Sequence, residues 1–94
     1  MTEPDDDSQR LDKWLWYARF FKTRTRATAI CRKRRIRVNR AVVAKPNHPL
    51  REGDVLTLPQ ASRIRVVRVL KLGERRGPAP EAQTLFEDLE PVGE

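Results

Sequence analysis

The chain has 94 residues, with 20 Lys+Arg against 13 Asp+Glu, a net charge of +7 and a pI near 10.5. This length fits a single domain, and no apolar run approaches the roughly 18 residues that cross a bilayer. One cysteine and one histidine exclude an internal disulfide, a Cys/His zinc site and a Ser-His-Asp triad. We therefore expect no metal, no cofactor and no enzymatic activity. The acidic N-terminus lacks the apolar core of a secretory signal, which favours a cytoplasmic protein.

The charge is distributed unevenly along the chain. Residues 10–40 hold twelve bases and one acid, a net charge of +11. Residues 1–9 hold four acids and no base, and residues 74–94 hold six acids and two bases. A segment this basic points to a polyanionic partner, either nucleic acid or an anionic membrane surface.

The acidic residues 1–9 are expected to form a disordered leader. Apolar residues then recur at helical spacing over residues 11–21, which predicts an amphipathic helix. The residues of this stripe expected in the core are Trp14, Leu15 and Ala18. Trp16 and Phe20 fall on the other side of that helix. They could stack on bases, but we expect them to pack under a C-terminal helix instead.

A second helix is predicted over residues 24–33, with Thr23 as its N-cap. Ala27 and Cys31 lie on its apolar side, and Cys31 is expected to be a small buried group. Continuing the helix would bring Arg34 onto that same apolar side. The helix is therefore expected to end there.

From residue 35 the apolar period changes to two, which predicts strands rather than helices. The predicted strands are residues 35–39, 41–44, 55–58 and 63–70, with a turn at Asn39-Arg40 and a proline-rich loop over 45–49. Behind Pro80, apolar residues repeat at helical spacing as far as Leu89. The predicted fold is α+β: two N-terminal helices packed on a small, mostly antiparallel sheet, plus a C-terminal helix.

Several ordered motifs resemble a known family. They are Arg10-Leu11-Asp12-Lys13-Trp14-Leu15, Lys22-Thr23-Arg24, Ile36-Arg37-Val38-Asn39, Lys45-Pro46 and Gly53-Asp54-Val55. Together they resemble the RNA-binding domain named after small-subunit ribosomal protein S-four, in which two helices pack on a small sheet. The resemblance implies such a domain over residues 10–72, with an extra strand, followed by a loop, a helix and an acidic tail over 73–94.

The segment Glu74-Arg75-Arg76-Gly77-Pro78-Ala79 and the opening Arg-Leu-Asp-Lys-Trp-Leu-Trp resemble a narrower group. That group is the ribosome-associated heat-shock proteins of about fifteen kilodaltons. The resemblance implies ribosomal RNA and the large ribosomal subunit as partners, with peptidyl-tRNA left by a translation stall as a further one. The family usually has glycine where Arg34 and Arg40 stand. If the backbone is the same, each arginine costs on the order of 1 kcal/mol in the left-handed region.

The predicted binding surface is the second helix with the strand that follows it. RNA duplexes are recognised largely through phosphates, 2′-hydroxyls and shape, and arginine offers a planar fork that matches phosphate. Amides at the start of the second helix could also receive a phosphate. The predicted RNA-binding residues are Arg10, Lys13, Lys22, Thr23, Arg24, Arg26, Arg32, Lys33, Arg34, Arg35, Arg37, Asn39, Arg40 and Lys45. Among them, Asn39 could contact a sugar or base, or serve only the turn.

Three other interpretations stay open at this point. A helix-turn-helix protein would place the second helix in the DNA major groove. A generic polyanion binder would not distinguish RNA from DNA. A membrane-surface protein would use the first helix, although its aromatics on both faces fit poorly. The net charge favours a monomer.

Overall fold

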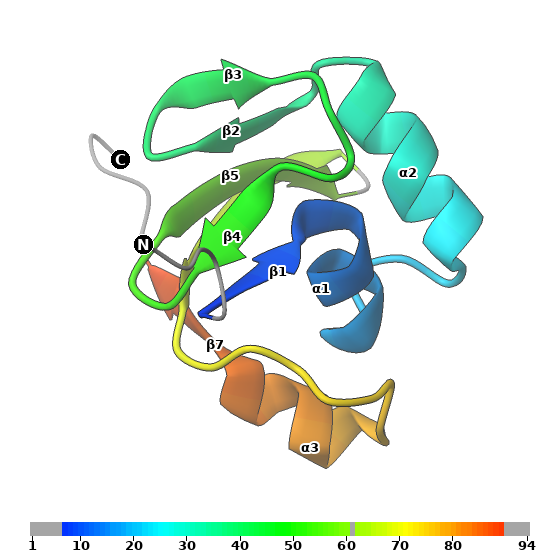
Figure 1. The fold of residues 1–94 in the computed structure, drawn as a ribbon, viewed down its shortest axis with the longest axis vertical. Helices are drawn as coiled ribbons and strands as arrows, with labels where there is room; N and C mark the ends of the chain where they lie inside the picture. Colours follow the sequence, from blue (N-terminus) through cyan, green and yellow to red (C-terminus); the bar gives the residue numbers. More distant parts are fainter. Residues whose placement is uncertain (1–6, 61, 90–94) are drawn as a thin grey trace, which may run out of the picture.

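The chain folds around a five-stranded antiparallel sheet with the strand order β3-β2-β5-β6-β7 (Figure 1). The computed structural model describes residues 7–60 and 62–89. A smaller sheet pairs β1 with β4. The strands are β1 Ser8–Arg10, β2 Ile36–Val38, β3 Ala41–Val43, β4 Pro49–Arg51, β5 Val55–Gln60, β6 Arg63–Val69 and β7 Phe86–Leu89. The predicted α+β class is confirmed.

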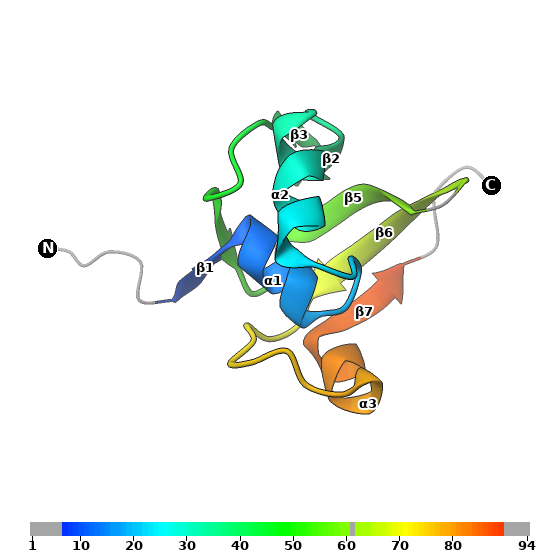
Figure 2. The ribbon, with the colours of Figure 1, turned by 90° about the vertical axis from the view of Figure 1, so that its right-hand side faces the viewer.

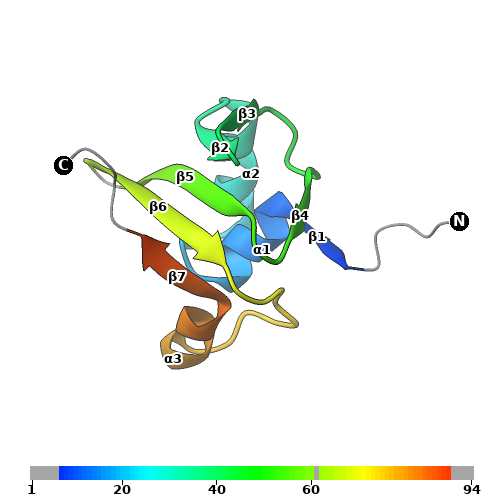
Figure 3. The same cartoon turned by 90° about the vertical axis from the view of Figure 1, so that its left-hand side faces the viewer.

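Three helices accompany the sheets: α1 Leu11–Tyr17, α2 Arg24–Arg32 and the short α3 Ala79–Ala82, which a 3-10 turn extends over Gln83–Leu85. Figures 2 and 3 show α1 and α2 on the same face of the main sheet. The core lies between these two helices and the sheet, and it includes Trp14, Leu15, Ala27 and Cys31, each with no exposed surface. This confirms the predicted burial of the apolar stripes on both helices.

The first helix is shorter than predicted, because it ends at Tyr17 instead of continuing to residue 21. Two backbone hydrogen bonds close it: the Arg19 N–H donates to the Trp16 carbonyl and the Phe20 N–H to the Leu15 carbonyl, both at 3.0 Å. This is the Schellman arrangement, which needs a left-handed residue, and Arg19 takes that role with φ of 66°. Glycine is the usual signal for such an ending, and the sequence lacks it here.

Because the helix ends early, Phe20 turns into the core while Trp16 stays half-buried. Phe20 packs on Phe86 with 4.7 Å between the ring centroids. Trp16 instead lies beside Tyr17 and under the Arg76 guanidinium. The prediction that both aromatics pack under a C-terminal helix is wrong: Phe20 packs on Phe86 of strand β7, and Trp16 lies under Arg76 of the preceding loop.

Both ends of the described chain differ from the predictions. Ser8 and Gln9, expected in a disordered leader, form β1 with Arg10 and pair with β4. The Gln9 side-chain amide also donates to the Gly73 carbonyl and accepts from the Gly73 N–H. Of the rest of the predicted leader, Asp7 lies in an exposed turn, and residues 1–6 lie outside the described residues.

The predicted C-terminal helix stops at Ala82, well short of Leu89. Phe86–Leu89 instead pair with β6, since the open edge of that strand offers a full ladder of backbone hydrogen bonds. The predicted segments 10–72 and 73–94 thus contribute to one sheet; the tail from residue 90 lies outside the described residues. Among residues 7–60 and 62–89, no helix is long and apolar enough to cross a membrane.

Candidate nucleic-acid interface

A buried carboxylate at the start of α1 organises two of the predicted RNA-binding arginines. Asp12 is 1% exposed. It accepts hydrogen bonds from Arg10 Nε at 3.0 Å, Arg10 Nη2 at 2.9 Å and Thr28 Oγ1 at 2.9 Å. Arg24 Nη2 lies 3.8 Å from Asp12 Oδ1, the oxygen that also accepts from Arg10 Nε. Asp12 therefore holds Arg10 and Arg24 side by side, each with nearly half of its side chain exposed.

The surroundings keep Asp12 ionised. Burial alone favours the neutral acid, but the hydrogen bonds from Arg10 and Thr28, together with the charges of Arg10 and Arg24, outweigh it and lower the pKa of Asp12. Asp12 lies in the first turn of α1, where a carboxylate is favoured by the helix dipole. Its link to Thr28 of α2 depends on tertiary packing, which no local pattern shows.

The loop after β3 docks on the same helix end. The Leu11 and Asp12 N–H groups donate to the carbonyls of His48 and Pro46, both at 3.0 Å. These bonds satisfy two of the amides that a helix start leaves without partners. They also place exposed Lys45, one residue before Pro46, close to the Arg10–Asp12 pair.

The start of α2 is built as predicted. Thr23 Oγ1 accepts from the Arg26 N–H at 3.1 Å, in the N-cap geometry. Lys22, Thr23 and Arg26 are exposed. Ala27 and Cys31 anchor the opposite side of the helix in the core, which leaves these polar groups facing outward.

The end of α2 and the β2–β3 hairpin carry a dense group of exposed cations, which we call the basic arm: Arg32, Lys33, Arg34, Arg35, Arg37 and Arg40. None of the six forms an ion pair with an acidic residue in the described part of the chain. Two of them adopt left-handed backbone, Arg34 with φ of 61° and Arg40 with φ of 77°. The expectation that arginine occupies two glycine-type positions is confirmed.

Arg37 is exposed between two buried neighbours, Ile36 and Val38, which face the core. Its side chain therefore leaves the sheet on the face opposite that core. The arm thus presents cations at the end of α2 and on the outer face of β2, and not on one flat surface.

Asn39 stabilises the β2–β3 turn and links it to the start of β5. Its Oδ1 accepts from the Val55 N–H at 2.9 Å and its Nδ2 donates to Asp54 Oδ1 at 3.0 Å. With φ of 51° it forms the turn together with Arg40. These bonds join the hairpin to the start of β5, so of its two possible roles the geometry favours the turn.

Lys13 lies apart from the basic arm. It is half-buried on α1, and its Nζ is 5.7 Å from the centroid of the Tyr17 ring. Of the predicted residues, Arg10, Arg24 and Lys45 gather near Asp12. Lys22, Thr23 and Arg26 form the start of α2, and the basic arm forms its end.

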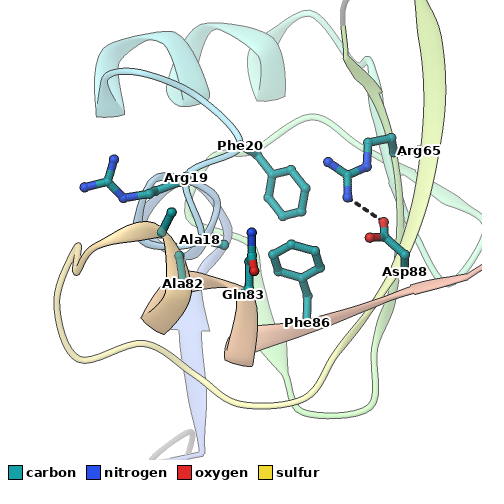
Figure 4. A pocket seen from close by; sticks show the side chains of 9 residues that line it. Ala18, Arg19, Phe20, Arg65, Ala82, Gln83, Phe86 and Asp88 are labelled. Atoms are coloured by element: carbon teal, nitrogen blue, oxygen red, sulfur yellow. Dashed lines mark hydrogen bonds and ion pairs between the residues drawn. The ribbon is translucent and has the colours of Figure 1, made fainter.

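Sequence reasoning missed a pocket beside the α1–α2 linker, with a volume of about 370 Å³ (Figure 4). Arg19 and Phe20 line it from the linker, Arg65 from β6, and Gln83, Phe86 and Asp88 from the C-terminal segment. The period of two along β6 does place Arg65 on the same face as buried Val67 and Val69, and that signal could have singled it out. The ring partner Phe86 could not be inferred, because it was expected on a helix.

The chain is similar to known proteins over half or more of its length. A family model described as the S4 domain matches residues 9–56. The heat shock protein 15 homolog of Haemophilus influenzae is 38% identical over 81 residues, which cover 86% of this chain and 61% of that protein. Heat shock protein 15 of Escherichia coli is 40% identical over 88 residues, which cover 94% and 65%. The chain thus spans less than two thirds of the length of these two relatives.

Two further comparisons cover more of the matched protein. The RQC P-site tRNA stabilizing factor of Listeria innocua is 34% identical over 83 residues, which cover 86% of this chain and 89% of that factor. The trimeric structure of heat shock protein 15 from Vibrio cholerae superposes with a TM-score of 0.83 at 36% identity. That match covers 87% of this chain and 82% of the solved one.

Proposed function

The chain belongs to the S4 domain family, and from that premise we propose that it is a non-catalytic RNA-binding protein of the ribosome. It binds the large subunit, and in particular large subunits that still carry peptidyl-tRNA after a translation stall. The names of its relatives support this assignment, since they include heat shock proteins and a factor that stabilises P-site tRNA. Such a protein acts in the cytoplasm.

The observation that carries the proposal is the basic arm. Six exposed cations without an acidic partner in the described residues repel one another unless a polyanion neutralises them. Arginine predominates among them, which suits contacts with phosphate. The Arg10–Asp12–Arg24 cluster and the start of α2 extend this surface, so we assign all the predicted cations except Lys13 to the RNA contact. Thr23 acts there as the helix cap.

Sedimentation with purified ribosomal particles tests the proposal. We expect the protein to sediment with large subunits, more strongly when they carry peptidyl-tRNA, and to be released as the salt concentration rises. Sedimentation with small subunits only, or with no particle, would contradict the ribosomal assignment. Equal binding with and without peptidyl-tRNA would reduce the function to general association with the large subunit.

A competition assay separates RNA from DNA. We expect structured RNA to displace bound RNA far better than duplex DNA does, since the basic arm continues from a helix onto a sheet instead of forming one groove-reading helix. Equal competition would indicate a generic polyanion binder. Absence of binding to anionic vesicles would close the membrane-surface interpretation.

The oligomeric state is part of the same proposal. The net charge of +7 favours a monomer, whereas the Vibrio cholerae relative was solved as a trimer. Light scattering at the concentrations used for binding measures the mass directly. A mass near 11.0 kDa would support the monomer.

A further inference from the structure

The pocket beside the α1–α2 linker lies outside the surface assigned above, yet next to it. Phe20 in its wall is only four residues before Arg24, so the pocket is at most roughly 14 Å along the chain from the start of α2. An RNA strand that contacts Lys22 and Arg24 therefore has to extend no farther than that distance to reach the pocket. Its volume of about 370 Å³ falls within the range of small-ligand sites.

The inner wall of the pocket is aromatic and cationic. The Phe20 and Phe86 rings lie 4.7 Å apart, and the Arg65 guanidinium carbon is 5.1 Å from one ring centroid and 5.7 Å from the other (Figure 4). Phe20 is almost fully buried, whereas Phe86 and Arg65 keep part of their surface exposed. Planar aromatic and guanidinium groups of this kind are surfaces on which nucleobases stack.

Arg65 is held in place before any ligand arrives. Its Nη1 donates to Gln60 Oε1 at 2.7 Å, and its Nη2 donates to Asp88 Oδ1. Gln60 in turn donates to the Phe20 carbonyl at 3.3 Å, which ties the guanidinium to the linker. A stacking surface fixed in this way loses little conformational freedom when a base binds.

The rim offers groups that recognise the edge of a base. Gln83 is exposed, and its side chain makes no hydrogen bond to another described residue, so its amide has donors and an acceptor available. Asp88 uses Oδ1 for Arg65, and its side chain as a whole is 62% exposed. Glutamine pairs with the adenine edge, and a carboxylate accepts from the amino group of cytosine.

Arg19 completes the rim in a strained conformation. It is a non-glycine residue with φ of 66°, and its Nε donates to the Gly77 carbonyl at 2.6 Å. This bond holds the linker against the segment that leads into α3. The pocket thus joins two parts of the chain that are about sixty residues apart.

We propose that this pocket takes one unpaired base of the bound RNA, stacked on Arg65 and Phe86, with a preference for bases that carry an exocyclic amino group next to Gln83 and Asp88. The inference rests on the proposed function, because the basic arm must first hold the RNA strand. Adenine and cytosine fit this rim, and uracil lacks the amino group that Asp88 would accept from.

Binding to a blunt RNA duplex and to the same duplex with one bulged nucleotide tests the pocket. For a bulged adenosine or cytidine we expect an affinity gain of about 5- to 150-fold, the range that stacking of one base gives, and a smaller gain for uridine. Ala79 of α3 also lines the pocket, so Ala79→Leu, which adds bulk there, should abolish the gain and leave the affinity for blunt duplex unchanged. Gln83→Ala should reduce the preference for adenosine over uridine.

Thr84→Leu is the matched control, because it adds a similar side chain at an exposed neighbouring position that does not line the pocket. It should keep the gain for the bulge. Equal affinity of the wild-type protein for blunt and bulged duplexes, or a gain that survives Ala79→Leu, would overturn the pocket and leave the RNA-binding function standing. Failure to bind either RNA would overturn both.

Discussion

The basic arm and the β6–β7–α3 region both carry arginines, but the two regions use them differently. In the C-terminal region, Arg65, Arg68 and Arg75 pair with Asp88, Glu87 and Glu81. In the basic arm, none of the six cations has an acidic partner in the described residues, because residues 10–40 contain one acid and that acid is buried at Asp12. Arginine thus forms ion pairs within the fold in the C-terminal region, whereas in the basic arm it remains available to an external polyanion.

The largest expected effect comes from removing charge separately in the two regions. Arg32→Gln with Lys33→Gln should make the slope of log K against log salt for RNA less negative by about 1.8, since each phosphate contact contributes about −0.9. The matched control, Arg68→Gln with Arg75→Gln, removes the same formal charge from paired positions and should change the slope by much less. Fluorescence anisotropy over a salt series measures both. Equal changes in slope would erase the distinction between the regions.

A second prediction concerns Asp12, the one acid within the basic segment. Asp12→Ala removes hydrogen bonds to Arg10 and Thr28 and leaves the Thr28 hydroxyl without one of its two partners. We expect a loss of about 1–3 kcal/mol in the free energy of unfolding, together with weaker RNA binding, since Arg10 and Arg24 lose their common anchor. Glu81→Gln at the exposed Arg75 pair should cost much less, because water screens both of these side chains. Equal losses would mean that burial adds nothing to the Asp12 cluster.

The same carboxylate predicts a dependence of stability on pH. The pKa of Asp12 is lower in the folded chain than in the unfolded chain, where it is near 4. Its contribution is therefore complete above about pH 4 and is lost as the pH falls through the folded-state pKa. Urea unfolding of wild-type and Asp12→Ala proteins over this acid range should give stability curves that converge as the pH falls. Parallel curves would contradict the shift.

Sequence patterns anticipated α2 and the basic arm well, because they needed only local information. The N-cap at Thr23, the buried Ala27 and Cys31, and the period of two around Arg37 each follow from spacing within a few residues. The C-terminal region was predicted poorly. The helical spacing up to Leu89 is real in the sequence, but pairing with β6 over a long separation prevails over it.

The candidate site divides in the same way. The cations themselves could be named from the sequence, whereas the anchoring of Arg10 and Arg24 by Asp12 could not. Nor could the pocket, since its walls come from a linker, a strand and a segment with the wrong predicted structure. The sequence could not show how distant segments approach one another. That approach decides which polar groups form hydrogen bonds and ion pairs within the fold.

A fourth prediction tests whether the basic arm trades stability for charge. Arg34 and Arg40 occupy left-handed backbone that glycine adopts without the steric cost of a Cβ. Arg34→Gly should therefore raise the free energy of unfolding by up to about 1 kcal/mol and raise the melting temperature, while RNA affinity falls. Arg40→Gly should behave alike. Calorimetry and RNA titration report the two quantities, and lower stability in either variant would mean that the arginine makes a compensating contact.

The smallest expected effect concerns Cys31, which lies beneath the cations of α2. Nearby positive charge ordinarily lowers the pKa of a thiol, yet burial, helped by the Asp12 charge, raises the pKa of Cys31 to about 12. The thiol should thus resist alkylation by iodoacetamide in the native protein and react after unfolding. Stability should also decline above about pH 9, where the thiol ionises only in the unfolded chain. Rapid alkylation of the native protein would show that the positive charge of the basic arm lowers the pKa of the buried thiol. Protection would show that this charge acts only at the surface, where an RNA can neutralise it.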